Sequence, residues 1–133
     1  MGNAIGTPKK KRILLTEDDV DLAELFQTGL EFFGYGVRIA RDGLQAVEMT
    51  TSEPPDLIIM DIRLPKMNGL EATTHIRRNP KTKDIPILAA TALAMPGDRE
   101  KCLAGGCDDY IAKPFTIAEL AAALKRLLGA RRR

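Results

Sequence analysis

Residues 55–65 read Pro-Asp-Leu-Ile-Ile-Met-Asp-Ile-Arg-Leu-Pro, an apolar run that ends in a carboxylate and then in a proline. Four consecutive apolar residues without polar alternation are typical of a parallel strand that is covered on both faces. Pro65 cannot donate to a strand ladder, so the strand is expected to end near Asp61. Ligands bind at the carboxyl ends of strands in open parallel α/β sheets, which makes Asp61 a candidate functional residue. A lone acid in this position more often only begins a loop.

Length and composition indicate one domain. The chain has 133 residues, 44% of them hydrophobic, which is enough for a single substantial core. No apolar run has the length needed to cross a bilayer, and the first residues do not resemble a signal peptide. Cys102 and Cys107 have the spacing of neither a disulfide framework nor a metal site. We therefore expect a cytoplasmic protein without a membrane contact, its two thiols buried and reduced.

The formal net charge of +2 hides an acidic body with basic ends. Nine basic residues lie near the ends, and without them 11 basic residues stand against 18 acidic ones. The overall charge therefore says little about partners. The basic ends can be interpreted as contacts with nucleic acid or an anionic membrane, but terminal charge runs are more often simply solvated. We expect a flexible leader at residues 1–10, a folded domain at 11–129, a basic tail at 130–133, and no direct binding of nucleic acid.

Strand and helix signals alternate along the chain. Short apolar runs predict strands at residues 12–16, 36–40, 57–61, 85–91 and 109–112. Helical periodicity and capping residues predict helices at residues 20–33, 42–52, 68–78 and 96–104, and another that begins at 116. This alternation requires right-handed crossovers and a parallel sheet with helices on both faces. The sequence thus predicts an α/β fold of the flavodoxin-like (βα)5 kind, a three-layer sandwich with strand order 2-1-3-4-5.

The predicted strands end in polar side chains that meet at one edge of the sheet. These residues are Glu17, Asp18, Asp61, Thr91 and Lys113. Three successive acids at residues 17–19 repel one another unless they face water or a cation, and carboxylate oxygens suit Mg²⁺. An acidic helix N-terminus is the simpler alternative for part of this cluster. Carboxylates for a metal, a nucleophilic carboxylate, a hydroxyl and an ammonium together indicate phosphoryl transfer.

The chain closely resembles the receiver domain of two-component response regulators over about residues 11–129. The resemblance is carried by residues 13–19 (ILLTEDD), 56–69 (DLIIMDIRLPKMNG), 90–92 (ATA) and 109–114 (DYIAKP). Its most specific part is the Asp-x-x-x-Pro-x-x-x-Gly pattern from Asp61 to Gly69. The resemblance implies that Asp61 accepts a phosphoryl group from a phosphohistidine on a sensor histidine kinase or phosphotransfer protein.

The same resemblance implies a metal site and a switch. Mg²⁺ would be held by Asp18, Asp61 and the backbone carbonyl of Arg63, with Glu17 reaching the ion mainly through water. In the switch, Thr91 would donate its hydroxyl to the phosphoryl group and Lys113 would pair with that group. Tyr110 would turn inward when Thr91 moves, and the fourth helix, fifth strand and fifth helix would form the face that binds an output partner.

Two further implications of the resemblance concern the backbone and the lifetime of the phosphorylated state. The peptide bond before Pro114 is expected to be cis. Arg63 and Leu93 would flank the water that removes the phosphoryl group, and neither is suited to orient it. The protein would thus be a phosphoacceptor that assists its own phosphorylation and dephosphorylation, and no stand-alone enzyme.

Other functions remain as alternatives. A Mg²⁺-dependent aspartyl-phosphate hydrolase of small phosphate esters would also use Asp61, but such enzymes typically place a second acid two residues later, where this chain has Arg63. No Gly-rich phosphate loop supports a nucleotide-binding module. An interaction domain that has lost phosphorylation would not need the intact polar set. Tyr110 can also be simple strand packing, and we interpret His75 as a surface residue.

Overall fold

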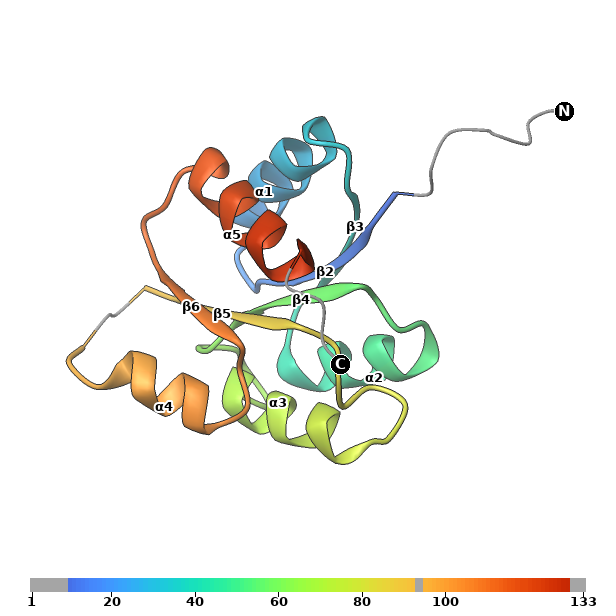
Figure 1. Cartoon of the computed structure of the whole chain (residues 1–133), viewed down its shortest axis with the longest axis vertical. Helices are drawn as coiled ribbons and strands as arrows, with labels where there is room; N and C mark the ends of the chain where they lie inside the picture. Colours follow the sequence, from blue (N-terminus) through green and yellow to red (C-terminus); the bar gives the residue numbers. More distant parts are fainter. Residues whose placement is uncertain (1–9, 93–94, 130–133) are drawn as a thin grey trace, which may run out of the picture.

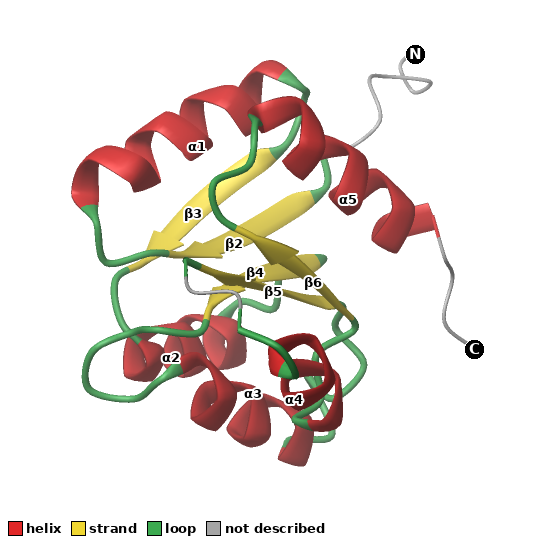
Figure 2. Ribbon diagram, turned by 90° about the vertical axis from the view of Figure 1, so that its left-hand side faces the viewer, coloured by secondary structure: helices red, strands yellow, loops and turns green. Residues whose placement is uncertain are grey.

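The computed structural model describes residues 10–92 and 95–129, which form a three-layer α/β sandwich (Figures 1 and 2). The strands in this part of the chain are β2 (Arg12–Thr16), β3 (Gly36–Ala40), β4 (Leu57–Asp61), β5 (Ile87–Thr91) and β6 (Asp109–Ala112). They form one sheet in the order β3-β2-β4-β5-β6, and every neighbouring pair is parallel. The predicted 2-1-3-4-5 order is confirmed.

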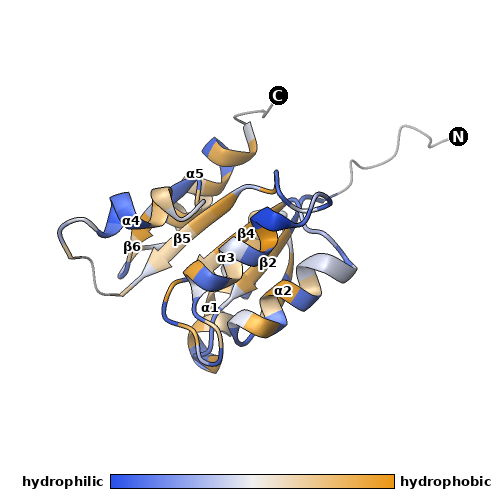
Figure 3. Ribbon diagram, turned by 90° about the horizontal axis from the view of Figure 1, so that it is seen from below, coloured by the Kyte–Doolittle hydropathy of each residue, from blue (hydrophilic) through white to orange (hydrophobic). Residues whose placement is uncertain are grey.

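Helices cover both faces of the sheet. They are α1 (Val20–Phe32), α2 (Gly43–Ser52), α3 (Gly69–Arg78), α4 (Asp98–Ala104) and α5 (Ile117–Gly129). Figure 2 shows α1 and α5 on one face, and α2, α3 and α4 on the other. Figure 3 shows that the strands between these layers are largely hydrophobic.

The core has two halves because successive strand residues point to opposite faces. In β4, Leu57 and Ile59 belong to the half under α1 and α5, whereas Ile58 and Met60 belong to the half under α2 and α3. All five residues of this strand are buried, so the central strand predicted from the apolar run is confirmed. The uninterrupted hydrophobicity of residues 57–60 therefore reflects burial on both sides of the sheet.

Most predicted element bounds lie within one residue of those in the structure, and two differ by two residues. β5 begins at Ile87 instead of Ile85, because the Ile85 N–H donates to Thr82 O in a turn and Pro86 has no N–H. α4 begins at Asp98, two residues later than predicted, because Gly97 adopts a left-handed conformation (φ 90°) that ends the preceding turn. α1 ends at Phe32, one residue before the predicted end, because Phe33 is its C-terminal cap, where its side chain is half exposed.

Other sequence expectations have mixed outcomes. Cys102 and Cys107 are free and buried, His75 is exposed, and the Lys113–Pro114 peptide bond is cis, all as predicted. Within residues 10–92 and 95–129, no helix is long and apolar enough to span a membrane. The expected leader at residues 1–10, apart from Lys10, and the expected tail at 130–133 lie outside the described residues, and so does Leu93.

Candidate functional site

A cluster of three carboxylates lies at the carboxyl end of the two central strands. β2 and β4 are parallel neighbours, so their carboxyl ends lie side by side. Glu17 and Asp18 directly follow β2, and Asp61 is the last residue of β4. One carboxylate oxygen from each of these residues lies within 4.8 Å of the others. Glu17 and Asp61 are 3% and 5% exposed, and Asp18 is exposed. The site therefore holds two buried acids and one acid open to solvent.

Lys113 brings a cation into this cluster from the end of β6. Its Nζ donates to Glu17 Oε1 at 2.8 Å and to Asp61 Oδ2 at 2.9 Å. Burial alone would lower the pKa of Lys113, but the two hydrogen bonds and the charges of both acids outweigh it and raise the pKa above its ordinary value. Lys113 is therefore held in its charged form between the two carboxylates.

The ionised form of Glu17 is disfavoured in the folded protein despite its ion pair with Lys113. Burial raises the pKa of Glu17, and the neighbouring charge of Asp61 adds to this increase. The hydrogen bonds from Lys113 Nζ and from the Asp19 N–H oppose the shift without cancelling it. Three acids share one ammonium in this cluster, so the site carries excess negative charge that a further cation would neutralise.

The donor set fits a hard divalent cation. Mg²⁺ binds oxygen ligands, typically one or two carboxylates with several waters, and three carboxylates within 4.8 Å offer such ligands. Arg63 lies beside this set, and its backbone N–H donates to Asp61 Oδ1 at 2.9 Å, which fixes the orientation of that carboxylate. The contribution of the Arg63 carbonyl to a metal site stays a prediction.

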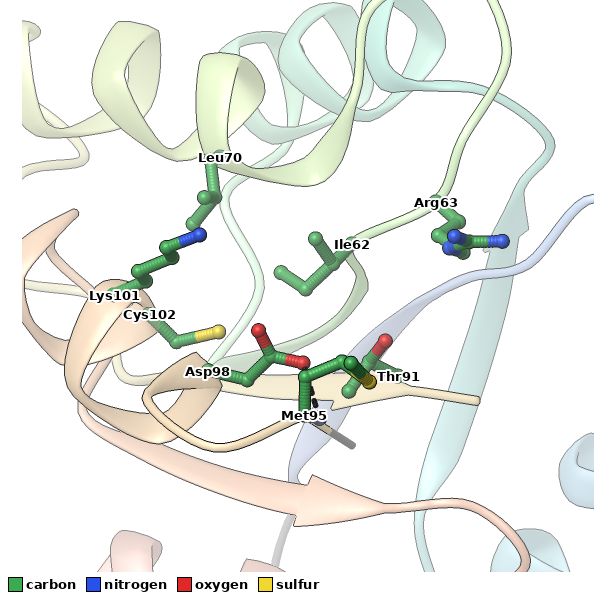
Figure 4. Close-up of a pocket in the computed structure, with 8 residues that line it drawn as sticks. All are labelled: Ile62, Arg63, Leu70, Thr91, Met95, Asp98, Lys101 and Cys102. Atoms are coloured by element: carbon green, nitrogen blue, oxygen red, sulfur yellow. Dashed lines mark hydrogen bonds between the residues drawn. The ribbon is translucent and has the colours of Figure 1, made fainter. Parts of the chain in front are cut away.

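Thr91 ends β5 next to Asp61, since Asp61 is opposite Ala90 in the register. It is 5% exposed and lines a cavity of about 280 Å³ together with Ile62 and Arg63 on one side and Asp98, Lys101 and Cys102 of α4 on the other (Figure 4). Figure 4 shows Arg63 at one end of this cavity and Lys101 at the other. The Thr91 hydroxyl is thus placed beside an open space at the edge of the acid cluster.

Tyr110 lies one strand farther from the acids, opposite Ala89 in the register. Its ring packs against the core half under α2 and α3, and its hydroxyl oxygen is shielded and has no hydrogen-bond partner among the described residues. Burial raises the pKa of Tyr110. A buried hydroxyl without a partner is costly, so this side chain gains if it finds one.

Sequence reasoning missed two contributions to the site. Thr16 Oγ1 accepts a hydrogen bond from the backbone N–H of Asp61, although Thr16 appeared only as the end of an apolar run. Gly69 is also required for packing, because a Cβ there would collide with the backbone carbonyl of Asp61. The glycine at the end of the Asp61–Gly69 motif therefore allows α3 to begin directly against the backbone of the central strand.

Comparison with known proteins assigns this chain to one class of protein. The family model described as "Response regulator receiver domain" matches residues 13–125. The chain is 38% identical to the polar-differentiation response regulator DivK of Brucella anthropi, over 90% of this chain and 97% of that protein. The chain therefore belongs to the response regulator receiver domain family, and receiver domains interact with histidine kinases or phosphotransfer proteins.

Solved structures show the same architecture. The receiver domain of sensor histidine kinase PA1611 from Pseudomonas aeruginosa PAO1, which has a magnesium ion coordinated in its active site cleft, is 42% identical with a TM-score of 0.85, over 92% of this chain and 100% of that one. The signal receiver domain of a signal transduction histidine kinase from Syntrophus aciditrophicus is 36% identical with a TM-score of 0.83, over 92% and 94%. Receiver domains with this fold thus occur in regulators and in sensor kinases.

Proposed function

We propose that Asp61 accepts a phosphoryl group from a phosphohistidine of a sensor histidine kinase or phosphotransfer protein. The observation that carries this proposal is the geometry around Asp61: a buried carboxylate at the end of the central strand, held by Lys113 Nζ at 2.9 Å and by the Arg63 N–H at 2.9 Å. A carboxylate fixed in this way presents an oxygen in a defined orientation, which is how enzymes position nucleophiles. The oxygen forms the new P–O bond as the P–N bond to the imidazole breaks.

The remaining side chains neutralise and orient the transferred group. Lys113 is already charged at the site and can move from the carboxylates to a phosphoryl oxygen, while the Thr91 hydroxyl donates to another. Glu17, Asp18 and Asp61 would hold Mg²⁺, which supplies charge neutralisation for the phosphoryl oxygens. Few groups suffice, because phosphoryl transfer depends mainly on positioning and electrostatic stabilisation. The same proposal makes the chain a phosphoacceptor that assists its own phosphorylation and dephosphorylation, in the cytoplasm, where two free thiols stay reduced.

The phosphorylated state is read, in this proposal, on the face formed by α4, β6 and α5. If Thr91 moves towards a phosphoryl group, it vacates space beside the cavity that it lines with α4. Tyr110 is on the adjacent strand and packs against the core half under α2 and α3, so its ring can fill the space that Thr91 leaves. The result is a packing change between two states, which an output partner can distinguish.

Intact-mass spectrometry tests the phosphoacceptor. Wild-type protein incubated with Mg²⁺ and acetyl phosphate should gain one phosphoryl group, and Asp61→Asn should gain none. Asp56→Asn is the matched control, since Asp56 directly precedes β4 at the amino end of the sheet, away from the acid cluster. Its carboxylate accepts a hydrogen bond from the Arg12 N–H. A phosphorylated Asp61→Asn protein would refute the assignment. In the phosphorylated wild type, amide exchange should change across β6, and a change confined to α1 would contradict the proposed switch.

A further inference from the structure

The side chain of Thr16 replaces a backbone group where the ladder between the two central strands ends. The register between β2 and β4 runs as far as Thr16 opposite Met60, so the next N–H of β4, that of Asp61, lies beyond it. This N–H donates to Thr16 Oγ1 at 2.8 Å. Thr16 Oγ1 in turn donates to the carbonyl of Ile59 at 2.9 Å. The hydroxyl therefore spans two backbone groups of the strand that ends in Asp61.

The direction of these two hydrogen bonds is fixed. A threonine hydroxyl has one proton and lone pairs, so a proton given to Ile59 leaves an acceptor position for the Asp61 N–H. Thr16 is 1% exposed, which keeps water from competing for either partner. A buried backbone N–H that loses its acceptor is costly, and the Asp61 backbone would shift to find another.

Thr16 also sets the position of the neighbouring acid. It directly precedes Glu17, whose backbone N–H donates to Ala40 O of β3 at 2.9 Å. The end of β2 is thus tied to β3 through Glu17 and to β4 through the Thr16 hydroxyl. One side chain therefore couples the backbone of Asp61 to that of Glu17, the two buried acids of the cluster.

We propose that Thr16 is a positioning residue that holds the Asp61 backbone in register with Glu17 for metal binding and phosphoryl transfer. This inference rests on the proposed function of Asp61. A purely space-filling role makes a different prediction, because valine has the shape of threonine without the hydroxyl. If Thr16 only fills the core, Thr16→Val leaves the site unchanged.

Two pairs of variants isolate the hydroxyl. Wild type and Thr16→Val differ by that group alone, and so do Thr16→Ser and Thr16→Ala. Thr50→Val is the matched control, because Thr50 is also fully buried but its hydroxyl has no hydrogen-bond partner among the described residues. These four variants and wild type are first compared by thermal unfolding, and Asp61→Asn is included as the protein without a phosphoacceptor.

The first readout needs no phosphoryl transfer. Hydrogen exchange of the Asp61 amide, followed by NMR, should be roughly tenfold faster in Thr16→Val than in wild type, since the amide loses its acceptor. The Mg²⁺ dissociation constant should rise, and the rate of phosphorylation by acetyl phosphate should fall, each about fivefold. Thr16→Ser should behave as wild type, Thr16→Ala as Thr16→Val, and Thr50→Val should change none of the three.

The outcomes separate this inference from the proposed function. If wild type is phosphorylated at Asp61 but both hydroxyl-free variants retain wild-type exchange, Mg²⁺ affinity and rate, Thr16 only fills the core and the inference is wrong. If wild type and Asp61→Asn behave alike with acetyl phosphate, the proposed function fails, and the exchange of the Asp61 amide still decides whether Thr16 holds that backbone. A fivefold loss of Mg²⁺ affinity and of phosphorylation rate in Thr16→Ser would show that the methyl group of Thr16, and not its hydroxyl, holds the site.

Discussion

Two buried ionic clusters occupy opposite ends of the same sheet. At the carboxyl end, Lys113 pairs with Glu17 and Asp61. At the amino end, Arg77 of α3 pairs with Asp108 at 2.8 Å, and the two side chains are 20% and 12% exposed. Both clusters join segments that are distant in sequence. Burial of charge alone therefore does not distinguish the candidate functional end of the sheet from the other end.

The two clusters differ in their balance of charge and hydrogen bonds. Arg77 faces one carboxylate and donates its other hydrogen bonds to the carbonyls of Gly106, Lys83 and Ile85 at 2.9, 2.8 and 2.6 Å. Asp108 also accepts from the Ile87 N–H that begins β5. The Arg77–Asp108 pair thus joins one cation to one carboxylate, whereas at the carboxyl end two buried acids and exposed Asp18 share one ammonium. Unbalanced charge of this kind is a common feature of functional sites.

The largest expected effect comes from breaking the balanced cluster. Arg77→Met should lower the free energy of unfolding by about 3–5 kcal/mol, because it removes the guanidinium from the mostly buried Asp108 carboxylate and the donor from three carbonyls. Arg77→Lys should recover little, since an ammonium lacks the planar fork that reaches all four acceptors. Urea titration measures both variants. Mg²⁺ affinity, corrected for the unfolded fraction, should stay at the wild-type value.

An exposed ion pair provides the control for this prediction. Arg126 is 61% exposed and lies 2.9 Å from Asp109, so Arg126→Met should cost at most about 1 kcal/mol. Equal losses of stability in Arg77→Met and Arg126→Met would show that the Arg77 cluster is not a structural centre, and the comparison between the two ends of the sheet would fail.

A smaller and opposite effect is expected from relieving the unbalanced cluster. Burial raises the pKa of Glu17 above its ordinary value of 4.5, so the folded protein binds this proton more tightly than the unfolded chain does. The stability contributed by Glu17 is therefore fully present below pH 4.5 and is lost as the pH rises through the folded pKa. Glu17→Gln should raise the free energy of unfolding at pH 7, without Mg²⁺, by roughly 0.5–2 kcal/mol.

The sign of this effect should depend on pH and on the metal. The advantage of Glu17→Gln over wild type should fade as the pH falls through the raised pKa of Glu17 towards 4.5 and below, because wild-type Glu17 takes up its proton over this range. Saturating Mg²⁺ should stabilise wild type more than the variant, because binding to the folded state alone adds to stability. Glu53→Gln is the control, since Glu53 is 59% exposed and pairs with Arg12. If the difference in unfolding free energy between wild type and Glu17→Gln changes with neither pH nor Mg²⁺, the ionised form of Glu17 is not disfavoured in the folded protein.

The sequence predicted the features of the fold and of the candidate site that depend on the strands and on the residues at their carboxyl ends. The apolar run before Asp61 located the central strand, and parallel alternation placed Glu17, Asp61 and Lys113 at one edge before any distance was known. It did not predict Arg77, because a long side chain that reaches carbonyls 6 to 29 residues away leaves no periodic signal. Thr16 was missed for a related reason: a threonine that ends a buried strand looks apolar until its backbone partners are visible.

The start of α4 shows a third limit of sequence reasoning. Pro96 and the periodicity after it predicted the helix, but the left-handed Gly97 delays its start to Asp98. The Met95 N–H then donates to Asp98 Oδ2 at 2.8 Å in the turn before the helix. Glycine permits this conformation without requiring it, so only the structure reveals the choice.

The smallest expected effect concerns the lifetime of the phosphorylated state. Hydrolysis needs a water in line with the bond that breaks, and Arg63 lies two residues after Asp61 with its side chain exposed at one end of the 280 Å³ cavity that Thr91 also lines (Figure 4). A long guanidinium has no acceptor to hold such a water, whereas a shorter amide has both a donor and an acceptor. Arg63→Asn should therefore speed loss of the phosphoryl group two- to fivefold, which corresponds to ~0.4–1 kcal/mol of barrier.

Intact mass followed over time under saturating Mg²⁺ measures the rate of this loss. Lys101→Gln, at the other end of the cavity, is the control and should leave the rate unchanged. An equal increase in both variants would assign the effect to the cavity as a whole, and no increase in Arg63→Asn would show that this side chain does not control access of the water.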